Sequence, residues 1–340
     1  MSLQNASSDF VVANQARNLP LLATRELCAG RTFIVTGANT GLGLEAAKHL
    51  ACLGARRVIL GVRSPAKGEA AKKEIDEAAG TSNDNEVVQV WPLDLERFES
   101  VREFARRAGT ELDRVDALIA NAAVALPMRQ MAEGHIKPVT VNVLSTLLLA
   151  VLLLPVMREK ARNIGDGVFP RVVIVTSRAG FDDDVREEWD RIKGNPIKGM
   201  DAEDMVPLKT YPLSKLTETF AVRHLARELL PVEKGGVIIN LVCPGLCITT
   251  LSRHAPPEFA ENLHNMHVNY GRTAEDGSRT LLHGAVAGVE SHGKLLHSCT
   301  DGEPDVPDWV KNDTESQKNT WEIIAKELEA IDPGCVSRLL

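Results

Sequence analysis

The chain has 340 residues, of which 44% are hydrophobic and 25% charged, and its 39 basic and 46 acidic side chains leave a formal net charge of −7. Its length and apolar content predict one large α/β domain with appended ends. The acidic balance excludes a nucleic-acid binder that relies on a broad basic face. The six cysteines are scattered without paired CxxC spacing, which argues against a metal site and is typical of reduced, cytoplasmic thiols.

Short apolar runs alternate with helical stretches along the chain. Repeated βαβ units of this kind predict an α/β fold: a Rossmann-like, doubly wound parallel sheet of about seven strands with helices on both faces. The expected strands are 32–36, 57–62, 87–91, 115–120, 171–176, 237–242 and 294–298. The expected helices are 42–53, 66–79, 97–108, an apolar segment between Lys137 and Arg158, 211–230 and a last helix near 315–331. Two long connections, 181–210 and 247–279, follow strand ends, where open α/β sheets bind ligands.

The apolar segment 138–157 has no charged residue and is long enough to span a membrane. It also contains Asn142, Ser145, Thr146 and Pro155, and predicted strands flank it closely. A helix that covers the sheet, with its other face in a subunit interface, explains the same residues. We therefore expect a buried helix and no membrane span.

A glycine-rich turn follows the first strand directly. It comprises Gly37, Asn39, Thr40, Gly41, Leu42 and Gly43, and helix-forming residues come next. Glycines at a strand-to-helix turn let the backbone approach a pyrophosphate, which the helix N-terminus then binds. Glycines also serve tight turns for purely structural reasons, but the position of this turn in a βαβ unit favours the binding role.

Tyr211 and Lys215 are four residues apart, so both side chains project from one face of a helix. A neighbouring ammonium is expected to lower the pKa of the Tyr211 phenol toward the working range of an acid–base catalyst. Ser177, at the end of the fifth strand, can donate a hydrogen bond to a substrate oxygen. Pro212 predicts that Tyr211 lies in the first turn of its helix. The alternative is a surface tyrosine beside a solvated lysine.

Matching patterns follow one another in chain order. They are TGxxxGxG at 36–43, Leu93-Asp94-Leu95, Asn121-Ala122-Ala123, Asn142 on the apolar helix, Ser177, the Tyr211–Lys215 pair, and Pro244-Gly245 with Thr249. Together they resemble the short-chain dehydrogenase/reductase family over roughly 31–298. The long gap between Ser177 and Tyr211 is similar to the retinol-dehydrogenase-like branch and to fungal secondary-metabolism reductases. Ala123 departs from the family pattern, which has glycine there.

The resemblance implies a role for each matching residue. Ser177, Tyr211, Lys215 and Asn142 would be catalytic, with Asn142 holding a water in a proton relay; the alternative is that Asn142 satisfies a backbone group. The cofactor-binding set would be Gly37, Asn39, Thr40, Gly41, Leu42, Gly43, Arg63, Lys67, Asp94, Leu95, Asn121, Tyr211, Lys215, Pro244, Gly245 and Thr249.

The end of the second strand indicates the choice of cofactor. An acid there binds the 2′-hydroxyl of NAD, whereas an arginine accommodates the 2′-phosphate of NADP. The sequence has no acid at this point and has Arg63 and Lys67 close by. It therefore favours NADP(H), although solvated surface cations are the alternative.

These observations predict an NADP(H)-dependent oxidoreductase that interconverts a ketone and a secondary alcohol on an apolar small molecule, in secondary metabolism and in the cytoplasm. The expected organisation is an N-terminal extension at 1–30, a dinucleotide-binding catalytic domain at 31–300 and a C-terminal extension with a helix at 301–340. Leu246, Ile248, Leu251, Pro256, Pro257 and Phe259 are expected to form an apolar lid. The sequence leaves open whether the protein forms a homodimer. The alternatives are an isomerase, cyclase or dehydratase that uses the same tyrosine, and a non-catalytic nucleotide-sensing scaffold.

Overall fold

The computed structural model describes residues 15–81, 87–161 and 169–339, so residues 1–14 of the expected N-terminal extension and the last residue of the C-terminal one lie outside it. Within the described residues, eight strands form one sheet in the order β10-β9-β8-β7-β4-β1-β2-β3. They are β1 Thr32–Thr36, β2 Arg57–Val62, β3 Val88–Pro92, β4 Ala117–Ala120, β7 Arg171–Val175, β8 Ile238–Cys243, β9 Leu295–His297 and β10 Thr300–Asp301. Neighbouring strands are parallel except for β10, which is antiparallel to β9. The predicted fold class is confirmed.

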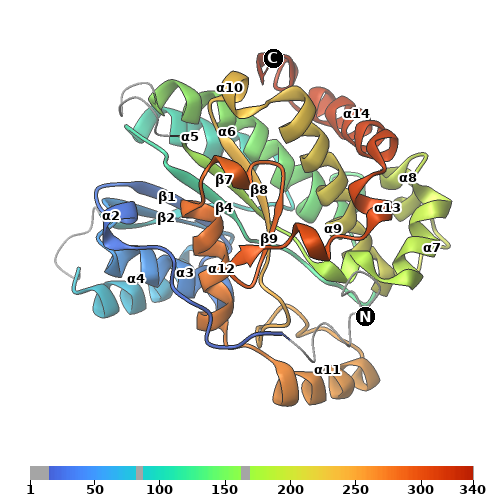
Figure 1. Cartoon of the computed structure of the whole chain (residues 1–340), viewed down its shortest axis with the longest axis horizontal. Helices are drawn as coiled ribbons and strands as arrows, with labels where there is room; N and C mark the ends of the chain where they lie inside the picture. The colour runs from blue at the N-terminus through green and yellow to red at the C-terminus, as the bar shows by residue number, and fades with distance from the viewer. Residues whose placement is uncertain (1–14, 82–86, 162–168, 340) are drawn as a thin grey trace.

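Helices cover both faces of the sheet (Figure 1). One face carries α3 Gly41–Cys52, α4 Pro65–Ala79 and α12 Ala274–Val286, and the other carries α5 Phe98–Glu111, the π-helical η2 Pro138–Ser145, α6 Thr146–Ala161, α9 Pro207–His224 and α14 Thr314–Ile331. Each face has its own core of buried apolar side chains. The strands are buried on both sides, which explains why they read as continuous apolar runs.

The strand order reverses at β1, which pairs with β2 on one side and with β4 on the other. The carboxyl ends of these strands, at Thr36 and Ala120, therefore border a crevice of the kind in which open α/β sheets bind ligands. The side-chain hydroxyl of Thr36 accepts hydrogen bonds from the backbone N–H groups of Asn121 and Ala122, both at 3.0 Å. These bonds hold the two strand ends together at the crevice.

The apolar helix is part of the core. Among the described residues, the helix Pro138–Ala161 is the one that is long and apolar enough to cross a membrane. Its most apolar 18-residue stretch is 83% buried inside the protein. The helix packs against α5, β4 and the final turn η7 Ser337–Leu339, and its first part packs against α9 and α14. The face that we expected in a subunit interface is thus covered by the chain itself.

The two long connections contain helices that the sequence analysis left out. The first holds α7 Asp183–Ile192 and α8 Pro196–Asp201, and the second holds α11 Pro257–Tyr270 and the start of α12. The prediction that Tyr211 lies in a first turn is wrong, because α9 begins at Pro207 and Pro212 lies inside the helix. A proline at the first helical position is favourable, and Pro207 fills that role.

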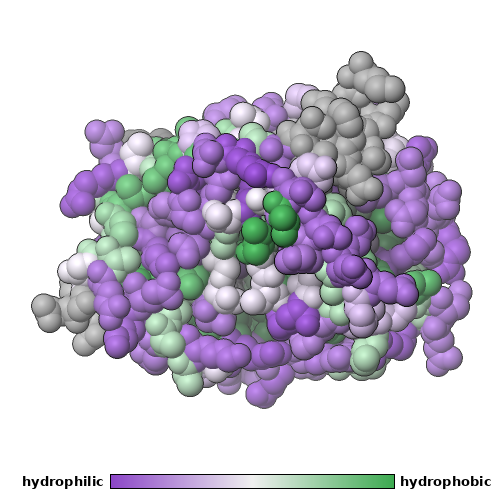
Figure 2. Space-filling view, turned by 90° about the horizontal axis from the view of Figure 1, so that it is seen from below, coloured by the Kyte–Doolittle hydropathy of each residue, from purple (hydrophilic) through white to green (hydrophobic). Residues whose placement is uncertain are grey.

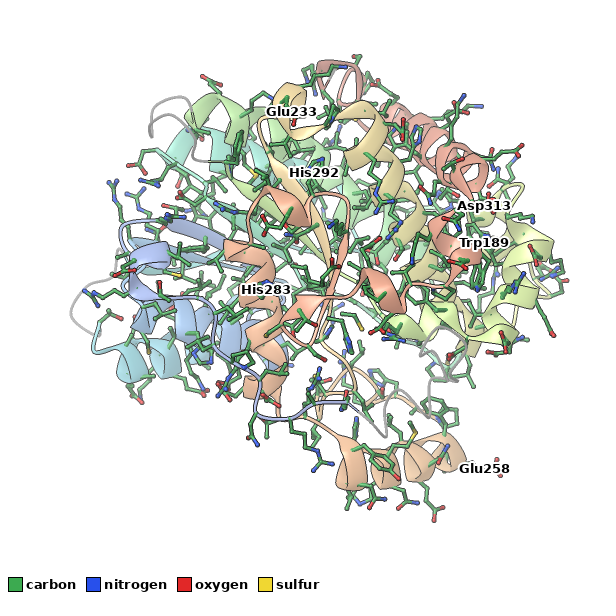
Figure 3. All side chains as sticks on the ribbon, in the orientation of Figure 1. Trp189, Glu233, Glu258, His283, His292 and Asp313 are labelled. Atoms are coloured by element: carbon green, nitrogen blue, oxygen red, sulfur yellow. The ribbon has the colours of Figure 1, made fainter. Side chains whose placement is uncertain are left out.

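The C-terminal extension packs along α9 and against α8. Trp321, Ile324 and Leu328 of α14 are buried in the same core as Leu216 and Phe220 of α9. Figure 3 places Asp313, the N-cap of α14, on the same side of the molecule as Trp189 of α7. The extension is therefore an integral layer of the fold.

The remaining short elements lie at the edges. They are α2 Arg25–Cys28, β5 Met131–Ala132, β6 His135–Ile136, η3 Arg178–Phe181, η4 Leu225–Leu229, α10 Val232–Gly235, η5 Val289–Ser291, η6 Glu303–Asp305 and α13 Asp308–Lys311.

Candidate active site

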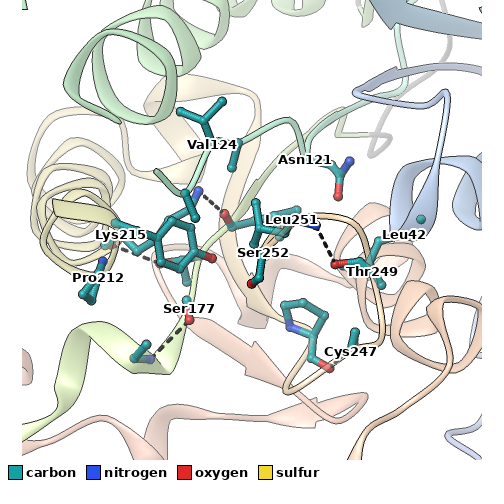
Figure 4. A pocket seen from close by; sticks show the side chains of 18 of the residues that line it. Leu42, Asn121, Val124, Ser177, Pro212, Lys215, Cys247, Thr249, Leu251 and Ser252 are labelled. Carbon is teal, nitrogen blue, oxygen red and sulfur yellow. Dashed lines mark hydrogen bonds between the residues drawn. The ribbon is translucent and has the colours of Figure 1, made fainter. Parts of the chain in front are cut away.

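A cavity of about 1920 Å³ lies at the carboxyl ends of the strands. It is lined by most of the residues singled out from the sequence, and Figure 4 shows part of it. Ser177, Tyr211, Lys215 and the cofactor set border it, except for Gly43. Asn142 also lies outside the lining and is fully buried.

The glycine-rich turn forms one wall and requires its glycines. Gly37 and Gly41 have φ angles of 66° and 58°, in the left-handed region that favours glycine. A Cβ atom on Gly43 would lie 2.7 Å from the side-chain nitrogen of Asn121. Within the described residues, the Thr40 side chain does not cap the first turn of α3, so the N–H groups there are available for an anion. The turn therefore suits the pyrophosphate of a nicotinamide cofactor.

The loop after β8 faces this turn. The side chain of Thr249 packs over Gly41, and the Thr249 hydroxyl accepts a hydrogen bond from the N–H of Leu251 at 3.3 Å (Figure 4). Gly245 has a φ angle of 78°, and the carbonyl of Pro244 accepts a hydrogen bond from buried Arg272 at 2.6 Å. The loop is thus fixed against the cofactor wall.

Arg63 lies at the end of β2 and lines the cavity, as does Lys67 at the start of α4. The sequence has no acid at the end of β2, but the fold brings Glu96 to Arg63. The Glu96 carboxylate lies 2.5 Å from the Arg63 guanidinium and 2.9 Å from Lys137. Glu96 follows the predicted Asp94-Leu95 pair by one residue, and Asp94 accepts a hydrogen bond from its N–H at 3.0 Å.

Ser177 and Tyr211 come together from different elements. Ser177 follows β7, and its hydroxyl accepts a hydrogen bond from the N–H of Ala179 at 3.2 Å. Tyr211 lies on α9 and borders the same cavity. An added Cβ on Gly180 would lie 3.0 Å from the carbonyl oxygen of Pro212, so the absence of a side chain lets η3 approach α9 beside Tyr211.

The pKa of Tyr211 is opposite to the sequence expectation. Burial raises the pKa of the phenol well above its usual value, nearby Cys243 and Glu218 raise it further, and the hydroxyl of Ser177 opposes the rise. We expected Lys215 to lower the pKa of Tyr211. Lys215 is not among the main causes of the observed shift, because its ammonium contacts other groups. It donates a hydrogen bond to the carbonyl of Val175 at 2.8 Å and lies 2.8 Å from the carboxylate of Glu218.

Asn142 is held by three hydrogen bonds at the π-helical turn η2. Its side-chain oxygen accepts from the N–H of Val124 at 2.9 Å, and its amide donates to the carbonyl of Val124 at 3.0 Å and to the hydroxyl of Ser214 at 2.9 Å. The side chain therefore links the loop after β4 to α9, one residue from Lys215. This geometry satisfies backbone groups, as our alternative for Asn142 required, and leaves its role in a proton relay a proposal.

Distant parts of the chain complete the cavity in ways that motifs do not reveal. Gln15, Asp305 and Trp309 line it from the two ends of the chain. Arg178, next to Ser177, donates to Asp305 at 2.6 Å. Of the expected lid residues, Leu246, Leu251 and Phe259 line the cavity, whereas Ile248, Pro256 and Pro257 do not. No local sequence signal connects positions so far apart.

The helix α11 contains Pro257 and Phe259 of the expected lid. It has no buried residue, and it extends from the body of the protein at the lower edge of Figure 1, with Glu258 pointing outward in Figure 3. The surface seen from below is mostly hydrophilic with apolar residues near its middle (Figure 2). The exposed Phe259 and Val268 belong to this helix.

Comparison with known proteins identifies the family. Residues 31–186 match the short chain dehydrogenase family. The chain is 38% identical over 329 residues to the short-chain dehydrogenase/reductase dmxR8 of Cryptosporiopsis sp., covering 91% of this chain and 94% of that relative. The chain belongs to the short-chain dehydrogenase/reductase family. This short-chain dehydrogenase is also 38% identical over 270 residues to atnD of Emericella nidulans, covering 78% of this chain and 82% of that protein.

Solved structures support the fold of this short-chain dehydrogenase. A short-chain dehydrogenase from Pseudomonas syringae superposes with a TM-score of 0.60 at 23% identity and covers 82% of this chain and 98% of its own. A 3-oxoacyl (acyl-carrier-protein) reductase from Agrobacterium tumefaciens, solved with NADP bound, has a TM-score of 0.60 at 20% identity over 81% of this chain and 96% of its own. Membership of the family makes the chain an oxidoreductase that binds a nicotinamide cofactor.

Proposed function

We propose that this protein is an NADP(H)-dependent oxidoreductase that interconverts a ketone and a secondary alcohol on an apolar small molecule, and that it acts in secondary metabolism. The observation that carries the proposal is the meeting of Ser177, Tyr211 and Lys215 in a cavity that also reaches the glycine-rich turn and Arg63. Ketone reduction needs this arrangement, because the hydride of the cofactor and the proton of Tyr211 have to reach the same carbonyl group.

Each residue has a distinct proposed task. The nicotinamide cofactor supplies or accepts the hydride when it is bound. Tyr211 gives a proton to the carbonyl oxygen during reduction, and Ser177 donates a hydrogen bond to the same oxygen as negative charge develops. Burial raises the pKa of Tyr211, which keeps the phenol protonated at neutral pH, so that its proton is present for transfer. Lys215 holds the cofactor ribose, and Asn142 fixes the loop and helix beside it.

The lining of the cavity supports an apolar substrate. Phe181, Leu208, Phe259, Met266 and Trp309 border it near the catalytic residues or on the lid. Burying apolar substrate surface against such side chains yields about 25 cal/mol for each Å² removed from water. Arg178, the charged residue next to Ser177, already pairs with Asp305, so this arginine is not left to bind a charged substrate.

The proposal is tested by following NADPH absorbance with a panel of aromatic and aliphatic ketones, each supplied with the purified full chain. We expect NADPH oxidation that depends on a ketone and yields the matching alcohol. Product formation without NADPH consumption would favour an isomerase, cyclase or dehydratase instead. NADPH binding without turnover on any compound, together with co-purification of a protein partner, would favour a scaffold.

Arg63 carries the proposed preference for NADP(H). Hydrogen bonds to charged groups contribute about 1.5–3 kcal/mol, and Arg63 can offer them to a 2′-phosphate. Because Glu96 already pairs with Arg63, the phosphate has to compete, and we expect the lower end of this range, about tenfold in affinity. Replacing Arg63 by Ala should therefore weaken NADPH binding about tenfold and leave NADH binding nearly unchanged.

Titrating the wild type and Arg63→Ala with both coenzymes measures this preference. Lys73→Ala is the matched control, because Lys73 is an exposed cation on α4 outside the cavity lining. The preference should shrink at high salt, since the side chain of Arg63 is 61% exposed. Equal affinity of the wild type for both coenzymes, or a preference that survives Arg63→Ala, would show that another residue or coenzyme is involved.

A cytoplasmic location belongs to the same proposal. The six cysteines all lie within the described residues and are free thiols, which supports a reducing compartment.

A further inference from the structure

The carboxylate of Glu218 lies in the interior beside the Lys215 ammonium. The two side chains sit one turn apart on α9, the oxygen–nitrogen distance is 2.8 Å, and their exposed fractions are 0% for Glu218 and 3% for Lys215. Tyr211, Lys215 and Glu218 follow the spacing of residues that share one helix face. The proposed acid–base pair is thus followed on the same helix face by a buried acid that has no role in the proposed reaction.

Glu218 has little else to bind. Its carboxylate contacts the Lys215 ammonium at 2.8 Å and has no other polar partner among the described residues. Leaving a carboxylate buried in this way is costly unless a charge compensates it. A purely structural position in this core would be occupied more favourably by an apolar side chain, so the acid calls for a functional explanation.

The other charged groups around α9 have partners of their own. Arg178 of η3 binds Asp305, and Asp201 of α8 binds His135. The inward-facing side chains of α7 are the apolar Val185, Trp189 and Ile192, and η2 has no titratable residue. Lys318 and Glu322 of α14 act on His224, at the end of α9, and β8 contributes the thiol of Cys243. In the described part of the chain, Lys215 is the charged group that acts on Glu218.

We infer that Glu218 is a positioning residue that holds the Lys215 ammonium and offsets its charge, so that Tyr211 remains a neutral phenol and serves as the proton donor for ketone reduction. The inference rests on the proposed function, in which Tyr211 is the acid–base group. An unopposed ammonium next to a phenol favours the phenolate, which is the base needed for alcohol oxidation. A carboxylate on the far side of that ammonium shifts the balance back toward the phenol.

The pKa directions agree with this geometry. Burial raises the pKa of Glu218 to about 7, and Lys215 opposes the rise. The charge of Glu218 in turn raises the pKa of Tyr211, in addition to the larger effect of burial. Glu218 therefore loses its proton at about pH 7, and above that pH its negative charge acts on Lys215 and Tyr211.

Tyrosine ionisation tests the inference directly, because the chain has only two tyrosines, Tyr211 and Tyr270. In a Tyr270→Phe background, the ultraviolet difference spectrum of tyrosinate reports Tyr211 alone. We expect Glu218→Gln to lower the pH at which Tyr211 ionises, because the substitution removes a carboxylate charge that raises the pKa of this phenol and leaves the Lys215 ammonium unopposed. Glu228→Gln, an exposed acid further along the same chain segment, is the control and should not move it.

The pH profile of ketone reduction gives a second readout. The rate of ketone reduction falls at alkaline pH because the Tyr211 phenol loses its proton, and in Glu218→Gln this alkaline fall should shift to lower pH by the same amount as the ionisation of Tyr211. The rate at acidic pH should stay near that of the wild type. A merely structural role would lower the rate at every pH without moving the limb. If Glu218→Gln does not fold, Glu218→Met removes the same charge with an apolar side chain of similar size and carries the same expectation.

An unchanged or higher ionisation pH for Tyr211 in the folded variant would overturn the inference. The two hypotheses can fail separately. If the wild type transfers no hydride to any ketone, the proposed function fails although the spectroscopic titration still tests Glu218. If the wild type reduces ketones and the titration does not move, the assignment to Glu218 alone is wrong.

Discussion

Replacing Tyr211 by Phe is expected to lower kcat for ketone reduction by about 10²- to 10⁴-fold, because a positioned general acid contributes about that much to the rate. The phenylalanine ring fills the same space on α9 and removes only the hydroxyl. NADPH should therefore bind the variant with nearly wild-type affinity, and the thermal unfolding midpoint should stay close to that of the wild type. Steady-state kinetics and a coenzyme titration on the same preparation measure both quantities.

Tyr270→Phe is the matched control for this substitution. Tyr270 is the other tyrosine of the chain and ends α11, where its side chain is exposed. The control should keep its kcat. Near-wild-type turnover by Tyr211→Phe would contradict the proposed role of Tyr211 as the proton donor.

Glu303→Ala is expected to reduce the free energy of unfolding by about 3–5 kcal/mol, since removing one partner of a buried ion pair leaves the other charge uncompensated. The Arg223 side chain is 0% exposed, and its guanidinium donates to both carboxylate oxygens of Glu303, at 2.8 and 2.7 Å. Glu303 also accepts hydrogen bonds from Arg227 at 3.1 Å and from the N–H of Leu295 at 2.9 Å. The carboxylate thereby links α9 to β9 and to the C-terminal extension.

The pH dependence of the stability lost in Glu303→Ala provides a further check. Burial alone would raise the pKa of Glu303, but hydrogen bonding and charge from Arg223 outweigh it and lower the pKa below the usual 4.5. A lowered pKa in the folded state means that the carboxylate stabilises the protein fully above about pH 4.5 and loses this contribution as the pH falls through its folded pKa. The difference between Glu303→Ala and the wild type should therefore be largest near neutral pH and should shrink in acid.

Asp301→Ala is the control for Glu303→Ala. The Asp301 side chain is 55% exposed, lies 3.7 Å from Lys294 and accepts an exposed hydrogen bond from the N–H of Glu303 at 2.9 Å. It does not contact the buried Arg223, so its loss should change the free energy of unfolding by about 1 kcal/mol or less. Urea denaturation of the three proteins measures the difference. An equal effect of the two substitutions would contradict the importance that we assign to the buried pair.

The strands could be predicted closely because buried parallel strands have continuous apolar sequences. Residues 32–36 and 57–62 were expected as strands and match β1 and β2. The helix α7 was not predicted because it lies in the connection 181–210 and most of its residues are charged. Its buried residues Val185, Trp189 and Ile192 have helical spacing, so the periodicity held a signal that we did not use.

The candidate site was predictable where short motifs carry its chemistry and unpredictable where contacts join distant residues. The sequence placed Ser177, Tyr211 and Lys215 in one site through their motifs, and the structure brings them to one cavity. The pairing of Arg63 with Glu96 depends on how β2 and β3 align and could not be derived from either segment alone. Glu218 has the spacing that puts it near Lys215, but its complete burial became evident only when the layers around α9 were in place.

Transfer of deuterium from coenzyme to product tests the central claim most directly. The full chain would be incubated with NADPH deuterated at C4 of the nicotinamide on the transferred face and with a ketone that it accepts, and the alcohol would be analysed by mass spectrometry. We predict one deuterium on the carbinol carbon for each NADPH oxidised, with about 10²- to 10⁴-fold less labelled alcohol formed in the same time by Tyr211→Phe. A product that forms without deuterium and without NADPH consumption would contradict the assignment of this protein as an NADP(H)-dependent oxidoreductase.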